Sequence, residues 1–91
     1  MIRIVVYTSG DGCKQCELTK HVMEAAGLAF ESVDLSLPVN ADDLAFVTQV
    51  LGYSTVPVVL VDGCQHWAGF QPDAIRDVAV RLRGASLPGQ G

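Results

Sequence analysis

The chain has 91 residues, which is enough for one compact domain and too few for a second hydrophobic core. Apolar residue types make up 49% of it and charged types 18%, a balance typical of a globular domain rather than a disordered chain. The formal charge is −4 and the six Lys and Arg residues are scattered, so the basic surface that nucleic-acid binding requires is not expected. We expect a monomer that binds no nucleic acid.

No segment has the features of a targeting signal or a membrane anchor. Residues 1–7 are too short for the apolar region of a signal peptide and run directly into polar residues. No apolar stretch approaches the ~20 residues needed to cross a bilayer. We therefore expect a cytoplasmic protein without membrane contact. Its three cysteines, two of them in a C-x-x-C, indicate a reactive or metal-binding pair rather than a secreted disulfide framework.

The first third of the chain predicts a strand, a loop and a helix. Residues 2–7 are rich in β-branched side chains and almost continuously apolar, as in a central strand covered on both faces. A polar, glycine-containing loop over residues 8–12 ends at Cys13, where the helix begins. Gly27 is placed to end it. The apolar residues that recur at helical spacing are Leu18, Val22, Ala25 and Ala26.

The middle of the chain predicts a second strand and a second helix. Residues 28–35 mix apolar and acidic side chains, which indicates a more exposed strand. Asn40 followed by Asp43 resembles a helix cap with an acidic first turn, and Gly52 is expected to follow the helix. Its expected apolar stripe consists of Leu44, Val47, Val50 and Leu51.

The last third predicts an antiparallel hairpin and a final helix. Two strands, at residues 56–61 and 64–67, are separated by the tight Asp62-Gly63 turn. A helix starts at Pro72 and is expected to end at Gly84. The residues expected to share its buried face are Ile75, Val78, Ala79 and Leu82. We predict a single domain over residues 1–84 and a flexible tail at residues 85–91.

The predicted order is βαβαββα, with a C-x-x-C at the first turn from strand to helix. This order is typical of the α/β thioredoxin-like fold, a mixed four-stranded sheet flanked by three helices.

The position of the cysteine pair predicts disulfide exchange. Only a thiolate attacks a disulfide, and the unpaired N–H groups and dipole of a helix start favour Cys13 as a thiolate, with Lys14 adding a nearby cation. Cys16 follows one helical turn later, where it can reach back to Cys13. We expect Cys13 to be the attacking thiol and Cys16 the resolving thiol.

A structural zinc site or an inert buried pair is the alternative for the same cysteines. A complete zinc site would need Cys64 and His66 in addition to the pair. A hairpin running away from Pro57 carries Cys64 roughly 15 to 20 Å from the first helix, which disfavours this arrangement. We expect no metal, no role for Cys64, and surface positions for His21 and His66.

Two further segments carry alternative interpretations. Pro57 either starts a strand, where a missing N–H is tolerated, or forms a cis bond that turns the backbone of Val56 towards an extended substrate segment. Trp67 and Phe70, on either side of Gly69, are either core residues or an apolar patch that docks a partner. Tyr7 and Tyr53 are weaker candidates for the rim of that patch.

Three motifs resemble those of the NrdH-redoxins, glutaredoxin-like proteins with thioredoxin-like behaviour, and the resemblance covers nearly the whole chain. Cys13-Lys14-Gln15-Cys16 fits their C-x-Q-C site. As in that family, the segment Leu51-Gly52-Tyr53 precedes Val56-Pro57-Val58-Val59. The most specific match is His66-Trp67-Ala68-Gly69-Phe70-Gln71-Pro72-Asp73, which is similar to H-W-S-G-F-x-P-D.

The resemblance implies a dithiol-disulfide oxidoreductase whose only redox group is the Cys13–Cys16 disulfide, with no cofactor. It implies electron donation to the large subunit of class Ib ribonucleotide reductase and recharging by thioredoxin reductase and NADPH. Carried over by position, Pro57 is a cis-proline after Val56, and Lys14 and Gln15 belong to the active-site motif. The residues that would shape the partner surface are Trp67, Ala68, Gly69 and Phe70.

The chain departs from these relatives at three points. Ser9 stands near a position where relatives often carry Lys, Ala68 replaces the usual Ser, and the loop before Cys13 is one residue longer. Glutaredoxins hold the carboxylates of glutathione with basic side chains, which Ser9 cannot replace. A glutathione-dependent glutaredoxin and a zinc-binding interaction module remain as alternatives.

Overall fold

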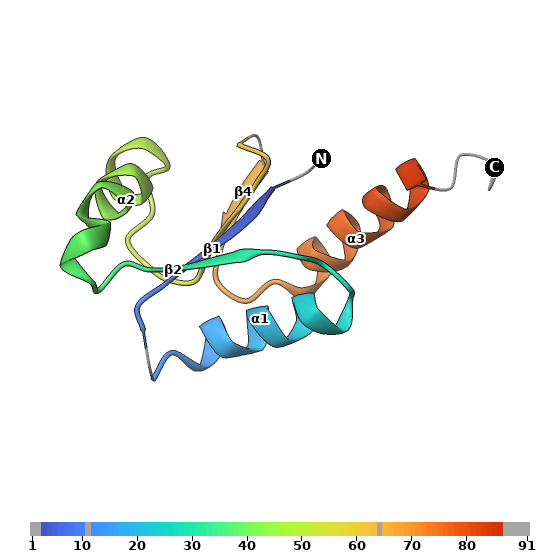
Figure 1. The fold of residues 1–91 in the computed structure, drawn as a ribbon, viewed down its shortest axis with the longest axis horizontal. Helices are drawn as coiled ribbons and strands as arrows, with labels where there is room; N and C mark the ends of the chain where they lie inside the picture. The colour runs from blue at the N-terminus through green and yellow to red at the C-terminus, as the bar shows by residue number, and fades with distance from the viewer. Residues whose placement is uncertain (1–2, 11, 64, 87–91) are drawn as a thin grey trace.

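The computed structural model describes residues 3–10, 12–63 and 65–86. Its elements follow the predicted order βαβαββα, with a 3-10 turn (η1) and a π-helical turn (η2) on either side of the second helix (Figure 1). The bounds are β1 Ile4–Thr8, α1 Lys14–Ala25, β2 Glu31–Asp34, η1 Pro38–Asn40, α2 Ala41–Ala45, η2 Phe46–Val50, β3 Val58–Val61, β4 Gln65–Ala68 and α3 Pro72–Ser86.

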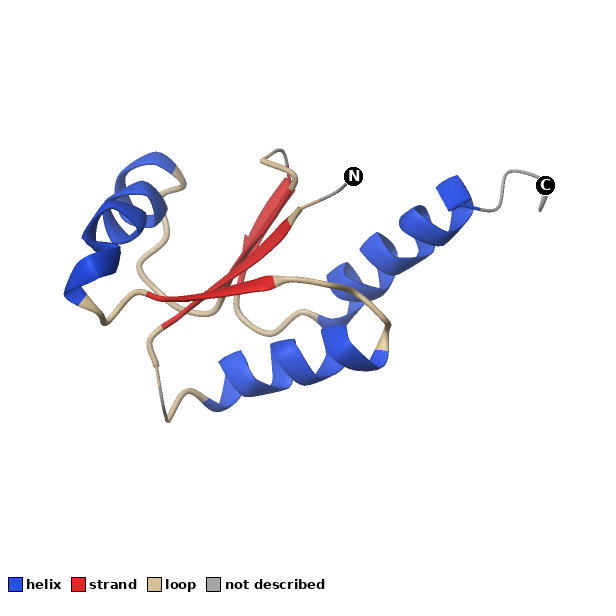
Figure 2. Cartoon of the chain, in the orientation of Figure 1, coloured by secondary structure: helices blue, strands red, loops and turns tan. Residues whose placement is uncertain are grey.

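The four strands form one mixed sheet in the order β2-β1-β3-β4. β1 pairs in parallel with β2 and antiparallel with β3, and β3 pairs antiparallel with β4. Helices α1 and α3 cover one face, while α2 lies on the other (Figure 2). All five residues of β1 are buried because the strand is internal and covered on both faces, which confirms the predicted central strand.

Alternating side chains of β1 point into two separate cores. Ile4 and Val6 belong to the core under α1 and α3, where Met23 and Ile75 are also buried. Val5 and Tyr7 belong to the core under α2 and η2; its other buried members are Leu35, Val47 and Val58. This period of two is what places helices on both faces of the sheet.

The predicted apolar face of the first helix is wrong at two positions. Leu18 is 47% exposed and Ala25 is also exposed, while the buried stripe consists of Cys16, Thr19 and Met23. Residues 16, 19 and 23 lie on one side of a helix, and residue 18 lies about 200° around it from residue 16. Seating Cys16 against the sheet therefore turns Leu18 towards solvent.

The second helical segment also differs from the predicted single helix. The Asn40 side chain does not cap it; instead Asn40 Nδ2 donates to the backbone oxygen of Asp34 at 2.8 Å. Val47 is buried, but Leu44 is exposed and Val50 is 70% exposed. In the π-helical turn the Leu51 N–H donates to the Phe46 carbonyl, five residues back, and the wider turn moves side chains off the stripe that a regular helix would form.

The hairpin and the final helix largely follow the prediction. Asp62 and Gly63 both have positive φ, as a tight turn requires, and Ile75, Val78 and Ala79 are buried. The predicted end at Gly84 is wrong, because α3 continues to Ser86. A glycine in a helix interior costs about 1 kcal/mol relative to alanine, which the packed face of α3 can offset. Residues 85 and 86 are thus helical rather than part of the predicted tail, while residues 87–91 lie outside the described part of the chain.

None of the helices in the described ranges is both long enough and apolar enough to cross a bilayer.

Candidate active site

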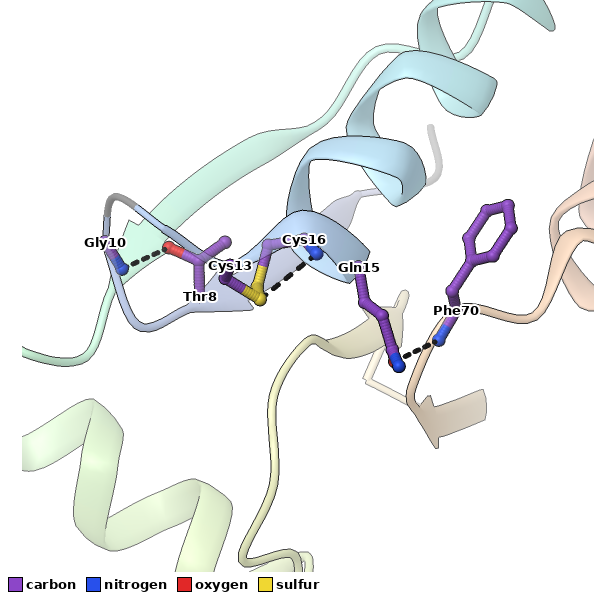
Figure 3. The surroundings of a disulfide bond; sticks show 6 residues. All are labelled: Thr8, Gly10, Cys13, Gln15, Cys16 and Phe70. Atoms are coloured by element: carbon purple, nitrogen blue, oxygen red, sulfur yellow. Dashed lines mark hydrogen bonds between the residues drawn. A yellow bond between two sulfur atoms is a disulfide. The ribbon is translucent and has the colours of Figure 1, made fainter.

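A disulfide between Cys13 and Cys16 lies at the N-terminus of α1, with the two Cα atoms 5.2 Å apart (Figure 3). Cys13 is the residue before the helix and has an extended backbone. Its Sγ accepts a hydrogen bond from the Cys16 N–H at 3.2 Å, and its carbonyl accepts one from Glu17. The sulfur of Cys13 therefore occupies the position where a capping oxygen commonly sits, at the positive end of the helix dipole.

The two cysteines differ in exposure. Cys13 is half-buried, whereas Cys16 is 1% exposed and belongs to the buried stripe of α1. A disulfide or thiolate arriving from solvent can reach Cys13 and not Cys16 while the helix is folded.

The loop between β1 and Cys13 is fixed at its start. Thr8 is buried, and its Oγ1 accepts a hydrogen bond from the Gly10 N–H at 3.4 Å. Gly10 has a φ of +85°, and a Cβ there would lie 2.9 Å from Asp34 Oδ2. The hydroxyl and the N–H of Ser36 both donate to Asp34 Oδ1 and lower the pKa of that carboxyl. Glycine is thus required where the loop passes the Asp34 carboxylate.

Pro57 is preceded by a cis peptide bond, which confirms the geometry implied by the resemblance. Pro57 is buried and Val56 half-buried. The Pro57 carbonyl accepts a hydrogen bond of 2.7 Å from the Gly69 N–H. This contact joins the segment before β3 to the segment after β4.

Gln15 connects the segment after β4 to the cysteine pair. The exposed Gln15 side chain accepts a hydrogen bond from the Phe70 N–H through Oε1, at 3.3 Å (Figure 3). Gly69 has a φ of +83°, and a Cβ there would lie 3.8 Å from Gln15 Oε1. The sequence placed Gln15 in the motif without indicating this partner, because a contact across 55 residues leaves no local pattern.

Trp67 and Phe70 have different environments. Trp67 is 6% exposed and lies in the core under α1 and α3, so the exposed-patch interpretation is wrong for it and ordinary core packing describes it. Strand alternation turns Ala68 to the α2 side of the sheet, where it is half-buried. Phe70 is half-buried beside Gly69. Partner binding through Ala68, Gly69 and Phe70 stays a prediction.

A pocket of about 300 Å³ opens on the α2 side, at the end of the sheet where β1 ends and β3 begins. All ten residues that line it are uncharged. They are Ser9, Leu35, Ser36, Leu44, Val47, Thr48, Tyr53, Ser54, Thr55 and Val56. The lining combines apolar side chains with several hydroxyl groups and carries no charge, so it suits a neutral group better than a carboxylate.

The two tyrosines proposed for the rim are placed differently. Tyr53 lines the pocket, and its hydroxyl lies 2.7 Å from Nδ1 of the exposed His66. Tyr7 is buried in the core under α2, so the rim interpretation is wrong for it. Burial, with Asp43 nearby, raises the pKa of the Tyr7 hydroxyl.

Charged groups lie on the outer face of α1. Lys14 is exposed and shares a shallow hollow with Glu17, Leu18, Lys20, His21 and Glu24. Within residues 3–10, 12–63 and 65–86 no group of three or more potential ligands is arranged to hold a metal ion. The zinc alternative also required Cys64, which lies outside the described residues and stays untested there.

Comparison with known proteins identifies the family. The Glutaredoxin family model matches residues 4–66. The Gene 56 protein of Mycobacterium phage L5 is 39% identical over 75 residues, which cover 82% of this chain and 70% of the phage protein. The glutaredoxin-like protein NrdH of Salmonella typhimurium is 39% identical over 72 residues, covering 79% of this chain and 83% of that protein.

The structural comparison agrees with the sequence comparison. The structure of NrdH-redoxin from Escherichia coli, described as a glutaredoxin-like protein with a thioredoxin-like activity profile, is 38% identical and has a TM-score of 0.67. The match covers 84% of this chain and 93% of that one. With its disulfide at the start of α1 and its thioredoxin-like fold, the chain belongs to the glutaredoxin family of thiol oxidoreductases and, within it, to the NrdH-like proteins.

Proposed function

We propose that this chain carries electrons from thioredoxin reductase and NADPH to protein disulfides, with the large subunit of class Ib ribonucleotide reductase as the expected acceptor. Cys13 is the attacking thiol and Cys16 the resolving thiol. The observation that carries the proposal is the difference between a half-buried Cys13 and a fully buried Cys16 in one disulfide at a helix N-terminus.

The exchange proceeds in two steps. The Cys13 thiolate attacks one sulfur of the substrate disulfide; an S–S bond forms to Cys13, the substrate S–S bond breaks, and the leaving sulfur takes up a proton. Cys16, having lost its proton, then attacks Cys13 Sγ and releases the second substrate thiol. The substrate gains two electrons and two protons, and the dithiol of this chain becomes the disulfide.

Local geometry supports Cys13 as the thiolate. The Cys16 N–H lies 3.2 Å from Cys13 Sγ, and hydrogen bonds from N–H groups at a helix start favour the charged form of an acceptor. The exposed Lys14 is next in sequence and adds positive charge. Cys16 is buried, which suits a thiol that acts second.

The surroundings of the disulfide favour a protein substrate over glutathione. Glutathione carries carboxylates, which are bound most strongly by basic side chains. The pocket at this end of the sheet is lined by uncharged residues, including Ser9 and Val56. The related NrdH-redoxin of Escherichia coli has a thioredoxin-like activity profile. A glutathione-dependent glutaredoxin is therefore the second candidate rather than the first.

The loop after β4 is the surface we assign to partner contact. Gly69 and Phe70 are held through their N–H groups by Pro57 and Gln15, so the half-buried Phe70 is carried on a backbone that is tied to the active-site motif. Aromatic side chains on a fixed backbone give a large share of binding energy at small interfaces. The same proposal places the protein in the cytoplasm, because cytosolic reductases keep such dithiols reduced. It also takes the protein to act as a monomer.

NADPH consumption tests the proposal. The oxidised protein is incubated with thioredoxin reductase and NADPH, and separately with glutathione, glutathione reductase and NADPH, while a disulfide substrate is reduced. We expect turnover with thioredoxin reductase alone. Turnover only with glutathione would establish the second candidate, and no turnover in either system would contradict both. If the first result is obtained, the reduced protein should replace a chemical dithiol in sustaining class Ib ribonucleotide reductase.

A further inference from the structure

Thr19 is a buried residue of α1 whose hydroxyl has no hydrogen-bond partner in the part of the chain that the structure describes. The side chain is 0% exposed, and Oγ1 forms no hydrogen bond with any described residue. Burying a hydroxyl without a partner costs free energy. A helical threonine usually avoids this by donating to the carbonyl four residues back, as Thr48 does to Leu44 at 2.9 Å. Thr19 is therefore an exception that packing alone does not account for.

The neighbour of Thr19 along the buried stripe is Cys16. The two residues are three apart on the same face of α1, and residues at this spacing are neighbours on a helix. Helical side chains lean towards the N-terminus, so Thr19 covers the turn that carries Cys16. With the disulfide closed, the sulfur of Cys16 is bonded to Cys13, and the Thr19 hydroxyl has no acceptor among residues 3–10, 12–63 and 65–86.

We propose that Thr19 is a positioning residue for the reduced state, in which its hydroxyl donates a hydrogen bond to the sulfur of Cys16. Reduction adds two electrons and two protons, which a reagent dithiol supplies as it closes its own disulfide. The S–S bond of the chain breaks, and a buried Cys16 sulfur without its covalent partner becomes available as an acceptor. The hydroxyl is unpaired in the disulfide and paired in the dithiol, so it favours the dithiol form.

A redox equilibrium distinguishes this role from a packing role. The full-length chain is equilibrated with mixtures of reduced and oxidised dithiothreitol, and the fraction oxidised is read from thiol alkylation. Thr19→Val keeps the shape and removes the hydroxyl, and should shift the equilibrium towards the disulfide about tenfold, or ~30 mV to more negative potential. Thr19→Ala should shift the equilibrium in the same direction. Thr19→Ser keeps a hydroxyl and should stay within about threefold of the parent equilibrium.

Thr48→Val is the matched control, since it makes the same substitution in another helical segment at an exposed hydroxyl that is already paired. It should leave the equilibrium unchanged. Urea unfolding of both redox forms gives an independent reading: Thr19→Val should lower the midpoint of the reduced form relative to that of the oxidised form. A merely structural role would change both forms alike.

The proposal is overturned if Thr19→Val and Thr19→Ala both stay within about twofold of the parent equilibrium, or if Thr19→Ser shifts it as far as Thr19→Val. Because dithiothreitol replaces every protein partner, neither outcome depends on whether thioredoxin reductase recognises the chain.

Discussion

The two faces of the sheet are built differently. Among the described residues, the face under α1 and α3 buries ten residues in its core, and the helices that cover it have 12 and 15 residues. The face under α2 buries five, and its cover is divided among a 3-10 turn, a short α-helix and a π-helical turn. Leu44 and Val50 remain exposed there.

This difference separates two tasks that meet at the disulfide. Cys16 is anchored in the buried stripe of α1, on the more heavily packed face, and that packing fixes where the helix N-terminus points. The uncharged pocket opens on the thinner face, beside Ser9 and Val56. The cysteine pair is therefore held by the well-packed side of the sheet, while the pocket lies on the side with the smaller core.

The largest effect is expected from the core under α3. Ile75 is fully buried there, so Ile75→Ala should lower the free energy of unfolding by about 2 to 5 kcal/mol, measured by urea unfolding of the oxidised protein. Val80→Ala on the same helix is the control, because Val80 is exposed and should change stability by no more than about 0.5 kcal/mol. Equal effects of the two variants would contradict the core assignment.

A smaller loss is expected on the opposite face. Val47 is buried in the core under α2, and Val47→Ala should cost about 1.5 to 3 kcal/mol in the same urea experiment. Because Val47 packs in the core on the face of the sheet opposite to α1, the dithiothreitol equilibrium should not change. If Val47→Ala lowered the free energy of unfolding more than Ile75→Ala does, the face under α2 would be the more stabilising one, contrary to this prediction. A large shift of the dithiothreitol equilibrium would show that the core under α2 also influences the stability of the disulfide.

The hydrogen bond from the Phe70 N–H to Gln15, which joins α1 to the loop after β4, is expected to give the next smaller effect on stability. Gln15→Met removes the acceptor for the Phe70 N–H and should cost about 0.5 to 1.5 kcal/mol of stability. The rate kcat/KM with thioredoxin reductase should fall about fivefold, the kinetic equivalent of ~1 kcal/mol. Gln49→Met, the same change at an exposed position of η2, should alter neither quantity. An unchanged rate for Gln15→Met would remove the loop from the partner surface.

Tyr7 predicts the smallest effect, confined to alkaline pH. Its pKa in the folded state is raised by burial and by Asp43, so the folded protein holds the phenol proton more tightly than the unfolded chain does. The contribution of Tyr7 to stability is fully present below the tyrosine pKa of the unfolded chain, about 10, and is lost as the pH rises above that pKa. In urea unfolding of the oxidised proteins between pH 8 and 11, the free energy of unfolding should fall more steeply with pH for the parent chain than for Tyr7→Phe. Identical pH profiles for the two proteins would contradict the raised pKa of Tyr7.

The sequence predicted the features that local pattern controls. A continuous β-branched run placed β1 inside the sheet, and Asp62-Gly63 marked the hairpin turn, because strand burial and turn type depend on residues close in sequence. The cysteine pair at a helix start was equally local. The resemblance to known proteins, rather than any residue pattern, implied the cis bond before Pro57.

Features that depend on distant contacts were missed. Leu18 is exposed because the seating of Cys16 decides which side of α1 faces the sheet, and apolar spacing alone cannot show that. The hydrogen bond from Phe70 to Gln15 depends on how β4 lies against the rest of the sheet, and so does the choice between core and surface for Trp67, which the sequence left open. The hydroxyl of Thr19 is unremarkable in sequence and distinctive only once its burial is known.

Trapping a mixed disulfide tests the central claim, attack by Cys13 and resolution by Cys16, most directly. Cys16→Ser and Cys13→Ser are each incubated at neutral pH with a disulfide-bonded protein, and the linked residue is located by peptide mass spectrometry. We predict that Cys16→Ser accumulates a stable adduct through Cys13, and that Cys13→Ser reacts through Cys16 at least about tenfold more slowly. Equal rates, or faster trapping through Cys16, would contradict the account.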